Sequence, residues 1–185
     1  LLISIGITLL VFIPGIGASY GGATRWINLG FTTFQPAELL KLGFVIYLAS
    51  FLSSLQNKLH TWKHGVLPFI ALLGLLSLLL LLQPDTGTVM VIFSTGLAMF
   101  IAAGARFRDI TGLGVLFVGA LTILASIRPY IMERLLTFLN PALDPLGSGY
   151  QIQQSLIAIG SGKIFGRGFG QSVQKFDTKY AKLKE

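Results

Sequence analysis

The segment 140–175, NPALDPLGSGYQIQQSLIAIGSGKIFGRGFGQSVQK, contains a single carboxylate, Asp144, among glycines and scattered cations. Pro145 favours an extended backbone at Asp144. A lone acid of this kind could act as a general base on a hydroxyl, while nearby cations stabilise an anion. The local sequence is equally compatible with an Asx turn. Because the segment follows a series of membrane-length apolar stretches, we expect chemistry on an anion that is carried by a lipid.

A second group of polar residues lies earlier in the chain, between residues 20 and 41. The planar guanidinium of Arg25 could bind a phosphate, although an arginine at a helix mouth often does no more than extend its charge to the membrane surface. Trp26 suits the headgroup region, where amphipathic rings collect. Glu38 and Lys41 are three residues apart at the start of an apolar stretch, so we expect a structural pair on one helix face.

Two further polar patterns are explained more simply by structure than by chemistry. In the segment 83–88, QPDTGT, Pro84 is expected to end one helix and Asp85 to cap the next; a place in an external polar cavity is the alternative for Asp85. His60 and His64 have the spacing of a zinc-binding pair on a helix. Their surroundings in the sequence offer no third ligand, so we predict a solvated loop and no metal site.

The composition indicates a membrane protein. Of 185 residues, 53% are hydrophobic and 11% are charged, whereas soluble domains carry about 25% charged residues. The mean hydropathy is +0.76. The absence of cysteine excludes disulfides, thiolate metal sites and cysteine nucleophiles. The net charge of +7 is spread singly over loops, which favours the membrane surface and anionic lipid over nucleic acid as a partner.

We predict an all-α fold, a polytopic transmembrane helix bundle with a long external loop. A bilayer core of about 30 Å needs roughly 20 apolar residues in a helix, and lipid offers no partner for unpaired backbone groups. Five stretches qualify or nearly do, and a loop and a Lys-rich tail follow them. The spans are 1–17, 36–55, 66–82, 86–105 and 110–127; the loop is 128–175 and the tail is 176–185.

Charge placement predicts the orientation of these helices. The connections 56–64 and 105–109 each hold at least two cations, whereas the turn 83–85 holds none. By the positive-inside rule, the two cationic connections face the cytoplasm. The turn 83–85 and the loop 128–175 then lie on the outer face.

Four motifs together resemble a known family. Their order and spacing are similar to those of the SEDS (shape, elongation, division and sporulation) membrane glycosyltransferases, and most similar to the division and sporulation branch, FtsW/SpoVE. The motifs are GATRWINLGF at 22–31, QPAELLKL at 35–42, QPDTGT at 83–88 and DPLGSGYQIQQSLIAIGSGKIFGRGFGQSVQK at 144–175. The resemblance implies a fold of about ten helices, of which about five lie in this sequence.

The resemblance implies a peptidoglycan glycosyltransferase that polymerises lipid II into glycan strands during bacterial cell division. The family's essential aspartate matches Asp144, and its external tryptophan matches Trp26. The leaving group, undecaprenyl pyrophosphate, needs cations rather than a second acid; the candidates are Arg25, Arg128, Arg134, Lys163 and Arg167. No cofactor is implied with certainty, although a divalent cation could assist. The implied partners are a class B penicillin-binding protein and other division proteins, at the bacterial cytoplasmic membrane.

Two alternatives remain open. A lipid II flippase would use Glu38, Lys41 and Asp85 as a headgroup path. A non-catalytic scaffold for division proteins would suit an incomplete chain, and the tail 176–185 departs from the segment that the family has after SVQK. We therefore expect this chain to be a piece of a longer protein, in which two family helices precede it and three follow it. The piece could be inactive alone.

Overall fold

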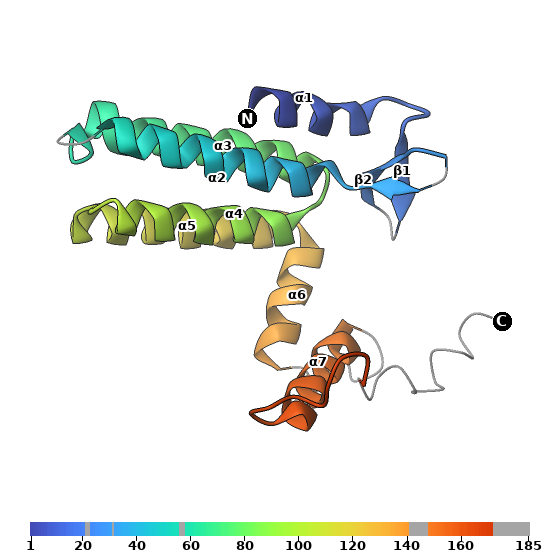
Figure 1. The fold of residues 1–185 in the computed structure, drawn as a ribbon. Coiled ribbons are helices and arrows are strands. Elements are labelled where there is room, and N and C mark those ends of the chain that lie inside the picture. The colour runs from blue at the N-terminus through green and yellow to red at the C-terminus, as the bar shows by residue number, and fades with distance from the viewer. Residues whose placement is uncertain (21–22, 31, 56–57, 141–147, 172–185) are drawn as a thin grey trace. The chain divides into compact units, whose positions relative to one another are not determined.

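The computed structural model describes residues 1–20, 23–30, 32–55, 58–140 and 148–171. Most of these residues are helical, and one small sheet accompanies the helices (Figure 1). The chain divides into two compact units, Leu1–Val118 and Gly119–Glu185. The first unit holds a helix bundle and the sheet, and the second holds the helices that follow.

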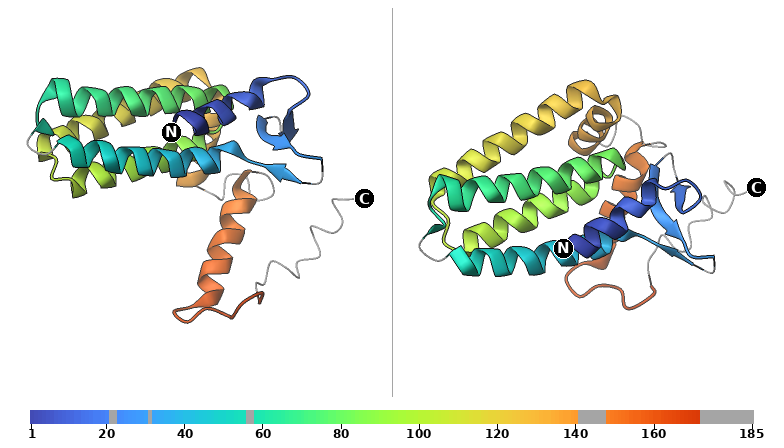
Figure 2. Two further views of the ribbon diagram at one scale, coloured as in Figure 1. Left: turned by 45° about the horizontal axis from the view of Figure 1, so that its top comes forward. Right: turned by 90° about the horizontal axis from the view of Figure 1, so that it is seen from above.

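The first unit is built from helices that pack side by side. α1 packs against α2, and α4 contacts both α2 and α3 (Figures 1 and 2). The predicted helical bundle is therefore confirmed. The elements are α1 (Leu2–Leu9) with the short η1 (Leu10–Phe12), α2 (Pro36–Leu55), η3 (Trp62–Val66) leading into α3 (Leu67–Leu82), α4 (Thr86–Ala102), and α5 (Phe107–Ile127), which continues into the second unit.

Three of these helical stretches are long and apolar enough to cross a membrane: Pro36–Leu55, Trp62–Leu82 and Phe107–Ile127. Two further apolar helices are shorter, Leu2–Phe12 and Thr86–Ala102. The 17 residues of α4 span about 25 Å, which is at the lower limit for a bilayer crossing. Of the five predicted spans, three thus reach full length and two are shorter.

Local sequence determines both ends of α4. Asp85 is its N-cap residue, a position that favours a short oxygen-bearing side chain. At the other end, Gly104 has a φ of 88°, and its N–H donates to the Ile101 carbonyl at 2.9 Å. The N–H of Ala105 donates to the Phe100 carbonyl at 3.2 Å, which completes a Schellman motif. The helix therefore ends at Ala102, before the predicted limit at residue 105.

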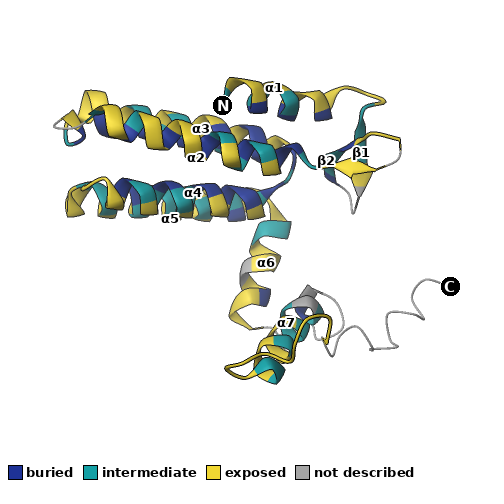
Figure 3. Ribbon diagram, in the orientation of Figure 1, coloured by how far each residue is buried: buried dark blue, intermediate teal, exposed yellow. Residues whose placement is uncertain are grey.

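The buried core of the first unit lies between α2, α3 and α4 (Figure 3). Phe69 of α3 stacks on Phe100 of α4 with ring centroids 4.6 Å apart. Gly96 permits close approach, because a Cβ atom there would lie 3.1 Å from Phe44 Cζ and 3.3 Å from Leu73 Cδ2. Small residues at helix contacts are typical of membrane bundles. The outward faces carry exposed apolar side chains, which suits contact with lipid.

A three-stranded antiparallel sheet connects α1 to α2. Its strands are β1 (Gly17–Tyr20), β2 (Ala23–Asn28) and β3 (Thr33–Phe34), in that order. The sequence predicts a loop here, whereas the structure has strands. The physical reason is that hydrogen bonds between the strands supply partners for backbone groups that lie outside the helices. Tyr20 pairs with Ala23 at the end of the β1–β2 ladder.

The second unit contains two helices where a loop, 128–175, is predicted. They are α6 (Pro129–Leu139) and α7 (Ser148–Gly162), and they pack against each other. Pro129 occupies the first position of α6, which proline tolerates. Both helices have apolar residues at helical spacing, and this periodicity is the reason that they are not loop. The predicted tail, 176–185, lies outside the described residues.

Candidate functional site

Polar groups from three separate segments meet at one end of the first unit. We call this group the polar end and define it as Thr8, Arg25, Gln83, Asp85 and Thr88. Gln83 is 2% exposed and Asp85 is 5% exposed. Since buried polar groups need hydrogen-bond partners, the contacts of these residues indicate what each of them does.

Arg25 on β2 holds the turn between α3 and α4. Its Nε donates to the Gln83 carbonyl at 3.2 Å, and its Nη2 donates to the Pro84 carbonyl. Gln83 Nε2 donates in turn to the carbonyl of Thr8, in α1, at 3.1 Å. Two of the five N–H donors of the guanidinium therefore fix the turn. The sequence predicts a phosphate ligand or a snorkelling side chain here, and neither prediction includes this contact.

Asp85 uses both carboxylate oxygens within the first turn of α4. Oδ1 accepts from the Thr88 N–H at 3.2 Å, and Oδ2 accepts from Thr88 Oγ1 at 2.7 Å. Thr88 is itself 8% exposed. This is the geometry of a helix cap, the first of the two roles that the sequence left open.

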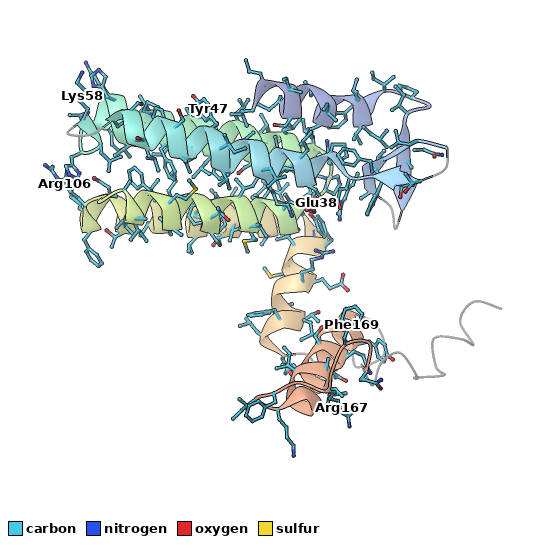
Figure 4. The ribbon with its side chains drawn as sticks, viewed as in Figure 1. Glu38, Tyr47, Lys58, Arg106, Arg167 and Phe169 are labelled. Carbon is cyan, nitrogen blue, oxygen red and sulfur yellow. The ribbon has the colours of Figure 1, made fainter. Side chains whose placement is uncertain are left out.

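Glu38 and Lys41 form an ion pair in the first turns of α2. Lys41 Nζ lies 2.9 Å from each Glu38 carboxylate oxygen. The side chains are 59% exposed for Glu38 and 30% exposed for Lys41, so both ions keep partial access to solvent. Figure 4 shows Glu38 at the end of the helices that carries the sheet, and Lys58 and Arg106 at the opposite end.

Trp26 is half-buried on β2, where it pairs with Ala18 of β1. Successive side chains of a strand point to opposite faces, so Trp26 and Arg25 face different surroundings. The structure therefore brings Arg25 and Asp85 to one turn and places Trp26 apart from them.

The other four predicted cations lie in the second unit, and all are exposed. Arg128 precedes α6, and Arg134 of α6 lies over the Tyr130 ring at 5.7 Å. Lys163 follows α7 with a φ of 49°, and Arg167 lies beyond it (Figure 4). Within the described part of the chain, none of the four forms an ion pair. Their charges could therefore bind an oxyanion.

Asp144, the predicted general base, lies outside the described residues. The polar end also includes three residues that the sequence did not single out as functional: Thr8, Gln83 and Thr88. Gln83 and Thr88 belong to the same QPDTGT motif as Asp85, and this motif could have indicated their role. Thr8 has no such signal, because its contact is made through its backbone carbonyl.

The fold and the polar end define a multi-pass helical membrane protein. Residues 1–179 match the family model FtsW/RodA/SpoVE, described as cell cycle protein. The chain therefore belongs to the FtsW/RodA/SpoVE family. The resemblance stated from the sequence motifs is confirmed.

Individual relatives agree with the family match. The chain is 45% identical over 174 residues to a protein of Idiomarina loihiensis named "Probable peptidoglycan glycosyltransferase FtsW", covering 94% of this chain and 42% of that protein. It is 41% identical over 167 residues to "Stage V sporulation protein E" of Bacillus subtilis, covering 90% of this chain and 46% of that protein. The chain thus spans less than half the length of these relatives.

A solved structure is also similar to this chain. It is described as "Structural coordination of polymerization and crosslinking by a peptidoglycan synthase complex". The TM-score is 0.61 at 36% sequence identity, and the match covers 85% of this chain and 46% of the other.

Proposed function

We propose that the protein to which this chain belongs is a peptidoglycan glycosyltransferase that polymerises lipid II into glycan strands during cell division. The observation that carries the proposal is the 45% identity, over 94% of this chain, to a relative named as such an enzyme. The proposed site of action is the outer face of the bacterial cytoplasmic membrane, where the loop 128–175 and the polar end would lie.

The proposed reaction is a single displacement at a sugar carbon. Asp144 accepts the proton of an acceptor hydroxyl as the hydroxyl oxygen attacks the anomeric carbon of the donor. The bond to undecaprenyl pyrophosphate breaks, and the pyrophosphate leaves as a stable anion. Because that anion needs stabilisation by cations, a second carboxylic acid is not required. Such a base typically contributes about 10²–10⁴-fold to the rate.

The exposed cations of the second unit are the proposed ligands of the pyrophosphate. Arg128, Arg134, Lys163 and Arg167 are accessible and form no ion pair in the described part of the chain. Arg25 is proposed to act differently, as a positioning residue, because its guanidinium already holds the α3–α4 turn. Trp26 is proposed to support the substrate at headgroup depth.

A class B penicillin-binding protein is the proposed partner, together with other division proteins. The similar solved structure belongs to a peptidoglycan synthase complex that coordinates polymerization with crosslinking. A crosslinking transpeptidase would supply the second of these activities to a glycan polymerase.

The test uses the full-length protein with its penicillin-binding partner in liposomes that contain lipid II. Asp144→Asn keeps the size of the side chain and removes the base, so we expect glycan-strand formation to fall by at least about 100-fold while lipid II binding persists. Glu133→Gln, an exposed acid on α6, is the matched control and should keep full activity. Polymerisation by Asp144→Asn at the wild-type rate would refute the assignment.

The same preparation separates the alternative functions. A flippase would move labelled lipid II across the vesicle membrane, and this movement would depend on Glu38 and Lys41. A scaffold would bind the partner without forming polymer in the wild-type protein. Either result without polymerisation would overturn the proposal.

A further inference from the structure

The apolar face of α6 is turned outward in the second unit. Met132, Leu136 and Leu139 recur at intervals of four and three residues, which places them on one helix face. They are 42%, 49% and 70% exposed. Figure 3 shows most of α6 in the colour of exposed residues. We call these three residues the apolar face of α6.

The polar side of the same helix differs in exposure from residue to residue: Glu133 and Arg134 are exposed, whereas the part that faces α7 is covered. α6 packs against α7, and Thr137, which lies away from the apolar face, is 7% exposed. Tyr130 is half-buried on the same side, next to Arg134. A helix surrounded by water would bury its apolar residues first. The exposure of Met132, Leu136 and Leu139 therefore indicates that the apolar face has an apolar environment.

The position of α6 along the chain identifies that environment. α5 is long and apolar enough to cross a membrane, and α6 begins two residues after its end at Ile127. The intervening Arg128 is extended, with φ −117° and ψ 99°, so α6 does not simply continue α5. With 11 residues, α6 is about 16 Å long, too short to cross the bilayer again. It must therefore start where α5 leaves the hydrocarbon.

We propose that α6 is an interfacial helix, whose apolar face inserts into the boundary between headgroups and acyl chains at the membrane surface where α5 ends. Amphipathic helices bind at this depth by burying their apolar side, with the charged side toward water. Arg128 at its start would place its charge among the headgroups. The partner of this surface is the lipid bilayer itself. The proposal does not depend on the glycosyltransferase reaction.

Spin labels on single cysteines test the proposal in the full-length protein in liposomes. The sequence of this chain has no cysteine, so Leu136→Cys and Met132→Cys need no further change within it. Glu133→Cys is the matched control on the polar side of α6, and Leu116→Cys, 54% exposed on α5, is the reference for a lipid-facing site. Collision rates with oxygen, which concentrates in lipid, and with a water-soluble nickel chelate are measured at each site.

We expect the labels at Leu136 and Met132 to collide with oxygen several-fold more often than the label at Glu133, and several-fold less often with the nickel chelate. Their values should approach those at Leu116. Equal values at Leu136 and Glu133 would place α6 in water and overturn the proposal. Low collision rates with both reagents would mean that another protein segment covers the face, which would overturn it as well. Two label sites guard against one variant that fails to fold.

Discussion

Removal of the Asp85 carboxylate tests whether the polar end is held by helix capping or by charge. In Asp85→Ala, α4 loses its N-cap, which costs about 1 kcal/mol. The Thr88 hydroxyl, which donates to Asp85 Oδ2 at 2.7 Å in a buried position, also loses its acceptor, at about 1–3 kcal/mol. The two terms together predict a loss of about 2–4 kcal/mol in the free energy of unfolding, or a roughly 30- to 10³-fold shift in the unfolding equilibrium.

Asp85→Asn separates the two explanations. Asparagine keeps an oxygen that can accept from the Thr88 N–H, and it is as good an N-cap as aspartate. Its amide can also pair with the Thr88 hydroxyl, which accepts as well as donates. We therefore expect Asp85→Asn to lower the free energy of unfolding by less than about 1 kcal/mol, which is what one typical hydrogen bond contributes.

The assay is denaturant titration of the full-length protein in detergent micelles, followed by tryptophan fluorescence, with lipid II polymerisation measured in parallel. The capping explanation requires that Asp85→Ala unfold well before Asp85→Asn. If the two variants are equally unstable, the charge matters and the capping argument fails. If both are stable but inactive, Asp85 belongs to a polar cavity that takes part in function.

Two further substitutions test other contacts in the same unfolding assay. Arg25→Lys replaces the guanidinium, which reaches both carbonyls of the turn, with a single ammonium group. We therefore expect the free energy of unfolding to fall by about 1.5–3 kcal/mol. Unchanged stability together with weakened lipid II binding would instead make Arg25 a substrate ligand. Gly96→Val would place side-chain atoms against Phe44 and Leu73, so we expect overpacking to cost about 1–3 kcal/mol. Its control is Gly74→Val, because a Cβ at Gly74 meets no atom within 4 Å; equal losses at both glycines would contradict the packing argument.

The sequence predicted those parts of the fold that depend on local signals. α2 has the predicted bounds, Pro36–Leu55, because a proline suits its first turn and apolar residues fill the rest. Asp85 was assigned correctly to the start of α4, since capping involves neighbours three residues apart. The family itself was predicted from four motifs, and the family match confirms it.

The parts that the sequence did not predict depend on partners far away in the chain. The contact between Arg25 and the α3–α4 turn joins residues that are 58 and 59 positions apart, and nothing next to Arg25 indicates it. The sheet was missed because an external segment between apolar helices was expected to be loop. α6 was missed as a helix because its apolar periodicity lies within a segment whose glycines and prolines suggested irregular structure.

The contacts of Arg25 and Gln83 also constrain the order in which the protein assembles. During synthesis, β2 appears before α2 and α3, and its partner carbonyls at Gln83 and Pro84 follow only after α3. In membrane proteins, helices insert first and associate afterwards. The contact between β2 and the α3–α4 turn must therefore wait until α3 has inserted with its C-terminal end on the same side of the membrane. Correct insertion of α3 is thus the step that allows the contacts of the polar end to form. In a chain with α3 inverted, the N–H donors of Arg25 would lack the carbonyls of Gln83 and Pro84 as acceptors.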